Sequence, residues 1–310
     1  MQFFKNNVQY ATHMNTERKV RIITDSTARV TPEEIERYGI GVAKLNIVVK
    51  ERGSSSIINT FKEEYDIDRP GFVKILEDRR LDVLTSAPTV GDFKDLFKQS
   101  KDRQTLFIHM AGKLSEGTPR AANSAKVEGG YDNVSIYDTE NVCLIKRQVI
   151  DAAILADQGK SIKEISASLD YSKKRSDLLV AIDRMYHLKK GGRASAIMSA
   201  LLEAAGMKTV LDVRNNVIKL LGLERGIGKS VELMENLSLN LKPTEICFFH
   251  GGDEMFKQIA QNAADEMRQK TNNKIKITLD YAGPLLTVHT GSRVIAVGIF
   301  SENPIPKKVI

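Results

Sequence analysis

Two adjacent hydroxyl side chains, Thr85 and Ser86, stand directly before the start of a predicted helix. Thr89 and Asp92 have the spacing of a capping box, in which two side chains satisfy free backbone N–H groups at a helix start. Hydroxyl donors beside such N–H groups, at the positive end of a helix dipole, can hold an anion. The competing interpretation is that Thr85 and Ser86 only cap the turn, and the rest of the chain must decide between the two.

Two further hydroxyl clusters follow predicted strands in the same way. Ser26 belongs to the cluster 24–27 after a strand at 20–23, and Ser115 and Thr118 follow a strand at 105–109. In an open parallel sheet, the carboxyl ends of the strands lie at one edge, where ligands bind. Three clusters at one edge are harder to explain by capping alone, so the sequence favours a ligand site built from hydroxyl groups.

A histidine near the end of the chain is a further candidate. His289 lies in a segment, 283–293, rich in glycine and hydroxyl residues, which we expect to be a loop that a ligand can approach closely. The four other histidines are scattered rather than paired at metal-ligand spacing, so no metal site is expected. No Gly-x-Ser-x-Gly turn presents a nucleophilic serine. The segment 222–230 resembles a phosphate-binding loop, but its first glycine comes one residue too early.

Composition places the chain among ordinary soluble proteins. Its 310 residues exceed one typical core and indicate two domains. The 46 Lys and Arg against 39 Asp and Glu are spread along the chain, whereas a nucleic-acid-binding surface would need the basic residues clustered. The two cysteines form no disulfide framework, and no apolar stretch approaches the roughly 18 residues of a membrane span. We therefore expect a cytoplasmic protein with no integral membrane segment and no nucleic-acid partner.

The order of predicted elements separates the chain into two parts. Up to about residue 170, strands alternate with helices, with a second strand at 41–49 and an irregular polar loop at 51–68. This alternation is typical of a parallel sheet with helices on both faces. From about residue 175, hairpins mix with helices, which indicates a separate α+β domain. We place the first domain at residues 19–173 and the second at 174–310.

Five short motifs, taken in order, resemble those of the DegV family of bacterial fatty-acid-binding proteins. Each motif is weak alone, but together they run from about residue 20 to the end of the chain. They are Thr24-Asp25-Ser26, Thr85-Ser86-Ala87-Pro88-Thr89, Lys113-Leu114-Ser115-Glu116-Gly117-Thr118, Leu188-Lys189-Lys190-Gly191-Gly192-Arg193, and the segment from Gly283-Pro284 to His289-Thr290-Gly291. Glu116 is an extra residue inside the third motif, so Ser115 and Thr118 compete for the role of the family serine.

This resemblance implies an α/β fold of two domains, an α/β/α parallel-sheet domain followed by an α+β domain with a mixed sheet. It implies a long-chain fatty acid as the ligand, with no other cofactor, no metal and no catalytic activity. The carboxylate of this ligand would be held by hydroxyl groups and the C-terminal histidine. The candidate ligand-binding residues are Thr85, Ser86, Ser115, Thr118, Ser26 and His289.

The resemblance also implies a partner. Some members of the family present the bound acid to a separate fatty acid kinase for phospholipid synthesis. Exposed basic residues of the second domain would then serve for docking, and Arg193 and Arg225 are the candidates here.

Two alternatives stay open at this point. An enzyme, such as a hydrolase or a kinase, could bind a small phosphorylated or carboxylated metabolite at the same turns, and a wide polar cleft behind Ser86 would favour it. A basic adaptor is the third possibility and predicts salt-sensitive binding to DNA or RNA. An apolar tunnel behind the hydroxyl groups would favour the fatty acid.

Overall fold

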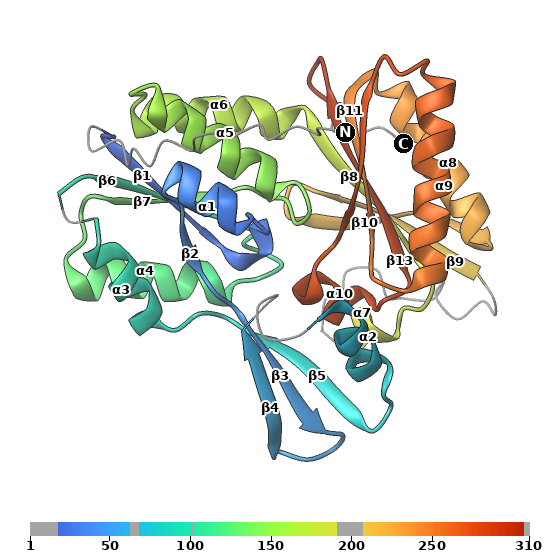
Figure 1. Ribbon diagram of the computed structural model, residues 1–310, viewed down its shortest axis with the longest axis horizontal. Helices are drawn as coiled ribbons and strands as arrows, with labels where there is room; N and C mark the ends of the chain where they lie inside the picture. The colour runs from blue at the N-terminus through green and yellow to red at the C-terminus, as the bar shows by residue number, and fades with distance from the viewer. Residues whose placement is uncertain (1–17, 63–67, 101, 191–206, 307–310) are drawn as a thin grey trace, which may run out of the picture.

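The computed structural model describes residues 18–62, 68–100, 102–190 and 207–306. Its strands form three sheets, one parallel, one mixed and one small and antiparallel (Figure 1). The expected fold class is confirmed, because a parallel sheet with helices on both faces precedes a mixed sheet with its own helices. The residue bounds proposed for the two domains stay a prediction.

The first sheet is parallel and covered by helices on both faces (Figure 1). Its strands, in the order β2-β1-β6-β7, are β1 (Val20–Asp25), β2 (Gly41–Ala43), β6 (Gln104–His109) and β7 (Val134–Asp138). Its helices are η1 (Ser26–Ala28), α1 (Pro32–Tyr38), α3 (Val90–Lys98), α4 (Gly117–Gly129), α5 (Ile145–Asp157) and α6 (Ile162–Lys174). Because successive side chains of a strand point to opposite faces, Ile22 packs with α5 and α6, whereas Ile23 packs with α3 and α4.

Local signals explain where several of these helices begin. The side chain of Thr89 accepts a hydrogen bond from the N–H of Asp92, whose carboxylate accepts from the N–H of Thr89 in return. This is the predicted capping box at the start of α3, and α1 and α6 begin with the same device. The cap of α3 is therefore formed by Thr89, whereas Thr85 and Ser86 make other contacts.

The second sheet is mixed and carries its two long helices on one face. Its strands, in the order β10-β9-β8-β13-β11-β12, are β8 (Ser176–Ile182), β9 (Met207–Arg214), β10 (Val217–Arg225), β11 (Pro243–His250), β12 (Lys276–Tyr281) and β13 (Val294–Ser301). All neighbours are antiparallel except β11 and β12. Helices α8 (Ile227–Asn240) and α9 (Glu254–Lys270) pack on one face, and the short helices α7 (Tyr186–Lys190) and α10 (Pro284–Thr290) lie on the other side (Figure 1).

The third sheet corrects three expectations from the sequence. It is an antiparallel sheet of β3 (Asn46–Glu51), β4 (Ile57–Lys62) and β5 (Leu81–Ser86), and α2 (Arg69–Glu77) connects β4 to β5. The sheet extends away from the other sheets (Figure 1). The strand expected at 41–49 is two strands in two different sheets, and part of the loop expected at 51–68 is β4. The strand before Thr85 and Ser86 pairs antiparallel with β3, so it is not part of the parallel sheet. β4 was missed because it is an edge strand whose side chains are nearly all exposed, which removes the alternation that marks a strand.

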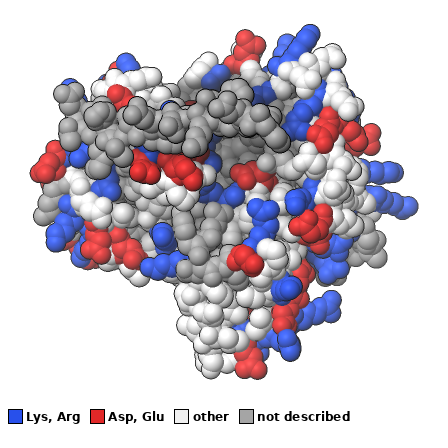
Figure 2. Space-filling view, in the orientation of Figure 1, with Lys and Arg blue, Asp and Glu red and all other residues white. Residues whose placement is uncertain are grey.

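Neither the charges on the face shown in Figure 2 nor the described helices indicate a nucleic-acid or membrane surface. On the face shown in Figure 2, the basic and acidic side chains of the described residues are interspersed and form no continuous basic stripe. None of the described helices has the length and apolar character needed to cross a membrane.

Candidate functional site

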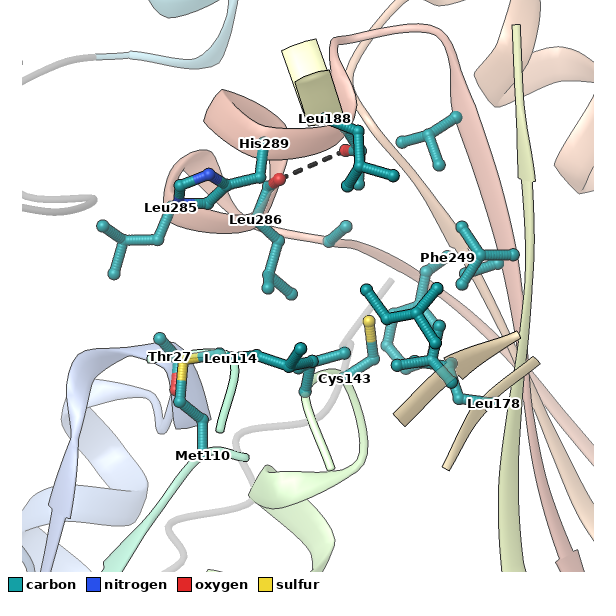
Figure 3. Close-up of a pocket in the computed structure, with 18 of the residues that line it drawn as sticks. Thr27, Met110, Leu114, Cys143, Leu178, Leu188, Phe249, Leu285, Leu286 and His289 are labelled. Carbon is teal, nitrogen blue, oxygen red and sulfur yellow. Dashed lines mark hydrogen bonds between the residues drawn. The ribbon is translucent and has the colours of Figure 1, made fainter. Parts of the chain in front are cut away.

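An apolar cavity lies where the three sheets meet. It offers about 110 Å³ to the centre of a water-sized sphere, several times the roughly 10–15 Å³ that one water molecule needs. Its walls come from β8, β9, β10, β11 and β13 of the mixed sheet, from α7 and α10, and from loops that follow β2, β6 and β7 (Figure 3). No lysine, arginine, aspartate or glutamate is among the described residues that line it.

Strand alternation builds the apolar wall of this cavity. Leu178, Val180 and Ile182 line the cavity from β8, while Leu179 and Ala181 point to the opposite face and pack against α8 and α9. Both faces of β8 are therefore buried, and all seven of its residues lie in the protein interior. The mixed sheet thus separates a packed core on one side from the cavity on the other.

Two polar side chains of the apolar cavity lie next to each other. The Oγ1 of Thr85 and the Nε2 of His289 lie 3.1 Å apart, within hydrogen-bond distance. Thr27 lies on the same side as His289 in Figure 3, whereas Leu178 and Phe249 lie at the far side. The remaining hydroxyl groups in the wall are those of Ser115 and Thr290. A chain with one polar head and a long apolar tail matches this distribution of surface.

A buried carboxyl fixes the position of Thr27. The Oδ1 of Asp25 accepts hydrogen bonds from the backbone N–H of Thr27, at 3.0 Å, and from its hydroxyl. The Oδ2 accepts from the N–H of Met110 at 3.1 Å, which ties β1 to the loop after β6. Burial raises the pKa of the Asp25 carboxyl, and the bonds from Thr27 and Met110 oppose this shift. Asp25 therefore orients a cavity hydroxyl without itself lining the cavity.

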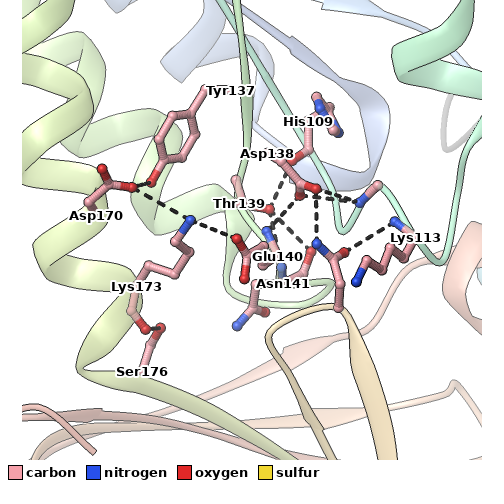
Figure 4. Close-up of polar contacts among 12 residues, drawn as sticks. His109, Lys113, Tyr137, Asp138, Thr139, Glu140, Asn141, Asp170, Lys173 and Ser176 are labelled. Carbon is pink, nitrogen blue, oxygen red and sulfur yellow. Dashed lines mark hydrogen bonds and ion pairs between the residues drawn. The ribbon is translucent and has the colours of Figure 1, made fainter.

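The loop that carries Ser115 is held by a hairpin of the other domain (Figure 4). The N–H of Gly112 donates to both carboxylate oxygens of Asp138 at 3.2 Å. The amide of Asn216, in the β9–β10 turn, donates to Asp138 at 3.0 Å and accepts from the N–H of Lys113 at 3.2 Å. A Cβ at Gly112 would lie 2.8 Å from Asp138, so the contact requires glycine there. These bonds fix the backbone just ahead of Ser115.

The structure separates the predicted site residues into two groups. Thr85, Ser115 and His289 come together at the apolar cavity, from β5, the loop after β6 and α10. Ser86 is exposed, because strand alternation turns it away from the cavity when Thr85 points inward, and its Oγ accepts from the amide of Asn46 at 3.4 Å. Ser26 is buried and accepts from the N–H of Leu45 at 3.0 Å.

The other predicted residues do not reach the cavity wall. Thr118 is fully buried in the first turn of α4, and its hydroxyl has no hydrogen-bond partner among the described residues. Arg225 is exposed at the end of β10. Arg193 lies outside the described residues. His289 was expected in a loop, but it lies on the helix α10, which Gly283 caps and Pro284 begins.

Sequence reasoning missed two polar residues of the cavity. Thr27 lines it instead of its neighbour Ser26, and Thr290 lines it next to His289. Both stand in hydroxyl-rich stretches that the sequence did mark, but which hydroxyl points inward depends on the geometry of η1 and α10. Within the described residues, no group of three or more His, Cys, Asp or Glu side chains is arranged to hold a metal ion.

The fold and the cavity define a class of protein in which two α/β domains enclose an apolar cavity with a polar end. Within that class, the chain belongs to the DegV family, whose profile matches residues 19–302 and is described as that of an uncharacterised protein family. A DegV domain-containing protein of Streptococcus pneumoniae is 23% identical over 286 residues, which cover 90% of this chain and 97% of the relative.

Solved structures show the same fold. One is a DegV family protein from Thermus thermophilus, described by its fatty acid binding, with a TM-score of 0.76 and 22% identity over 91% of this chain and 99% of that one. Another is DegV from Bacillus subtilis, described as a fatty acid binding protein, with a TM-score of 0.76 and 25% identity over 92% of this chain and 100% of that one.

Proposed function

We propose that this protein binds a long-chain fatty acid in the apolar cavity, with its carboxylate at the end formed by Thr85, Ser115 and His289. The observation that carries the proposal is the surface of that cavity, whose wall is largely apolar and holds the hydroxyl of Thr85 beside the imidazole of His289. The description of related structures as fatty-acid-binding proteins supports it. Ser86, which points to solvent, is no longer part of the proposed carboxylate site.

The energetics assign different roles to the tail of the fatty acid and to the hydroxyl groups that hold its head. A tail of about 15 methylene groups at ~0.8 kcal/mol each contributes roughly 12 kcal/mol of gross burial before the cost of association. Hydrogen bonds from neutral donors to a carboxylate contribute about 1.5–3 kcal/mol each. Neutral donors also avoid burying a permanent counter-charge. The tail therefore sets most of the affinity, and the hydroxyl groups set the orientation of the head.

We infer further that the protein is a cytoplasmic carrier that presents its ligand to a separate fatty acid kinase and does not convert the ligand itself. The absence of charged side chains from the described cavity wall supports a carrier, because the one titratable group beside His289 there is the Cys143 thiol, whose pKa burial raises to about 12. Arg225, exposed at the end of β10, and Arg193 are the proposed docking residues. The two unpaired thiols, Cys143 and Cys247, are consistent with a reducing compartment.

Organic extraction of the freshly purified protein, followed by mass spectrometry, tests the binding proposal directly. We expect a co-purified fatty acid in near-stoichiometric amount and, after delipidation, saturable binding of labelled palmitate or oleate. A protein that is empty as purified and also fails to bind both labelled acids would overturn the proposal. Turnover of a phosphorylated or carboxylated metabolite by the purified protein would instead favour the enzyme alternative.

A further inference from the structure

A second cavity, here called the cationic cavity, lies beside the apolar one. It offers about 360 Å³ to the centre of a water-sized sphere and is lined by residues of the antiparallel sheet, α2, α7 and the turn after α10. Thr290 lines both cavities, so the two share a wall immediately next to His289. Its basic lining residues are Arg52, Arg79, Arg184, Lys190 and Arg293.

The acidic groups around this cavity are fewer and already engaged. Glu77 accepts a hydrogen bond from the hydroxyl of Ser292 at 2.6 Å. Asp78 is held by the Nε of Arg80 at 3.0 Å and by its Nη2 at 2.7 Å. Neither carboxylate therefore neutralises one of the five basic lining side chains through a described ion pair.

Two acidic residues outside the cavity wall neutralise part of the positive charge of the basic lining residues. Asp82 pairs with Lys190 and, at 3.8 Å, with Arg52. Asp183 pairs with Arg293 at 3.2 Å and with Arg184 at 3.7 Å, as well as with Lys208. Counted together, seven basic and four acidic side chains surround the cavity, which leaves an excess of three positive charges.

Two arginines have binding capacity left over. Arg79 is exposed and makes no ion pair within the part of the chain that the structure describes. The Nε of Arg293 is buried and has no hydrogen-bond partner among the described residues, although its guanidinium stacks at 5.1 Å on the ring of Phe256. A buried N–H donor without an acceptor is costly, so the hydrogen-bonding capacity of this guanidinium is not used up by the described protein contacts. Burial lowers the pKa of His187, so this imidazole is neutral at pH 7 and leaves the charge balance unchanged.

We propose that the cationic cavity binds a phosphate group. The planar forks of arginine match the oxygens of phosphate, and the two negative charges of phosphate at pH 7 balance most of the local excess. The hydroxyl of Tyr186, to which Arg52 donates a hydrogen bond, adds a neutral donor to the same wall. This inference goes beyond the proposed function, since it concerns a site outside the apolar cavity and does not need a fatty acid to be bound.

Calorimetric titration of the full delipidated chain at low salt tests the inference. Pyrophosphate, ADP and vesicles containing phosphatidic acid serve as three separate probes, so that the outcome also distinguishes free phosphate, nucleotide and lipid as sources of the group. We expect saturable binding of at least one probe, weakened by added salt. Arg79→Gln and Arg184→Gln should each lower the affinity on the order of tenfold.

The control variant is Arg37→Gln, which removes the same charge from an exposed position on α1 that lines neither cavity. Thermal unfolding of all three variants checks that the fold is kept. Absence of binding with all three probes would overturn the proposal, and so would equal affinity in the Arg79, Arg184 and Arg37 variants. Because fatty-acid binding is measured on the wild type in a separate experiment, failure of one proposal can be told from failure of the other.

Discussion

At the scale of single residues, the contact between Thr85 and His289 determines which proton is available for a hydrogen bond to the carboxylate of the ligand. If the imidazole carries its proton on Nε2, it donates to the Oγ1 of Thr85, and the hydroxyl proton of Thr85 is then available to the ligand. The hydroxyl of Thr27, by contrast, donates to Asp25 while that carboxyl is ionised. Thr85 is therefore the hydroxyl best placed to orient the head group.

Removing the hydroxyl of Thr85 tests this role. Thr85→Val keeps the shape of the side chain but removes its proton, so affinity for oleate should fall roughly tenfold, the effect of one hydrogen bond to a charged group. Ser86→Ala, one residue away and exposed, is the matched control and should leave affinity unchanged. Fluorescence displacement on the delipidated protein measures both. Equal losses in the two variants would show that the carboxylate does not lie where we place it.

Ser115 and Thr118 present a second comparison. Ser115 lines the apolar cavity, whereas the hydroxyl of Thr118 is buried in α4 without a described partner. Ser115→Ala should weaken fatty-acid binding several-fold. Thr118→Val should leave binding unchanged and should raise the free energy of unfolding by up to about 1 kcal/mol, because it removes a buried polar group that makes no hydrogen bond. The opposite ranking in a binding assay would mean that the extra Glu116 has shifted this loop.

The sequence shows which stretches carry hydroxyl and histidine side chains, but not the direction in which each side chain points. The sequence marked the stretches 24–27, 85–86, 115–118 and 289–290 correctly as hydroxyl- or histidine-bearing, and each contributes a residue to the apolar cavity. Whether Thr85 or Ser86 points inward depends on the antiparallel pairing of β5 with β3, which no local sequence pattern predicts. The expectation that the strand before Thr85 belongs to the parallel sheet was therefore wrong, although Thr85 lines the apolar cavity.

At the scale of elements, the β9–β10 hairpin positions a loop that belongs to the other domain. Asn215 and Asn216 form its two-residue turn, both with positive φ. Beyond closing the turn, Asn216 bonds to Asp138 and to the backbone of Lys113. The turn residue thus serves the hairpin and the cavity at the same time.

Replacing this asparagine by glycine separates the two roles. Asn216→Gly retains a residue that tolerates positive φ but loses both amide contacts, so we expect a loss of about 1 kcal/mol in stability and a several-fold weaker affinity for oleate. Asn215→Gly, in the same turn at φ 53°, is the matched control and should bind normally. Chemical denaturation and the displacement assay report the two effects. If both variants bind like the wild type, the hairpin does not position the Ser115 loop.

Elements with strong local signals were predicted well and those without were not. The capping box at Thr89, which the sequence marks, begins α3 in the structure. The helix α10 was expected to be a loop because the segment 283–293 is rich in glycine and hydroxyl residues, and glycines flank the helix at 283 and 291. It is helical because Leu285 and Val288 pack into a core with β3 and α2, a contact that only the tertiary fold supplies.

At the scale of the whole molecule, the buried charges of the mixed sheet link stability to pH. The carboxyls of Asp177 and Asp212 face one guanidinium, that of Arg214, at 3.5 and 3.6 Å, and all three side chains are nearly buried. Burial and the neighbouring charge of Asp212 raise the pKa of Asp177 to about 7. One arginine cannot balance two ionised carboxyls, so the folded protein keeps a proton on this pair well above the pH at which the unfolded chain would lose it.

The sign of the pH effect follows from this proton. Between about pH 4 and pH 7 the folded state binds more protons at Asp177 than the unfolded state, so stability from this group is present at low pH and is lost as pH rises through about 7. The loss is at most about 1.4 kcal/mol per pH unit. Asp177→Asn, which cannot ionise, should flatten the dependence of the free energy of unfolding between pH 5 and 7, while Asp95→Asn on the exposed face of α3 should leave the slope unchanged. Urea denaturation at a series of pH values measures the slopes, and a wild-type slope that persists in the Asp177 variant would show that the proton is held elsewhere.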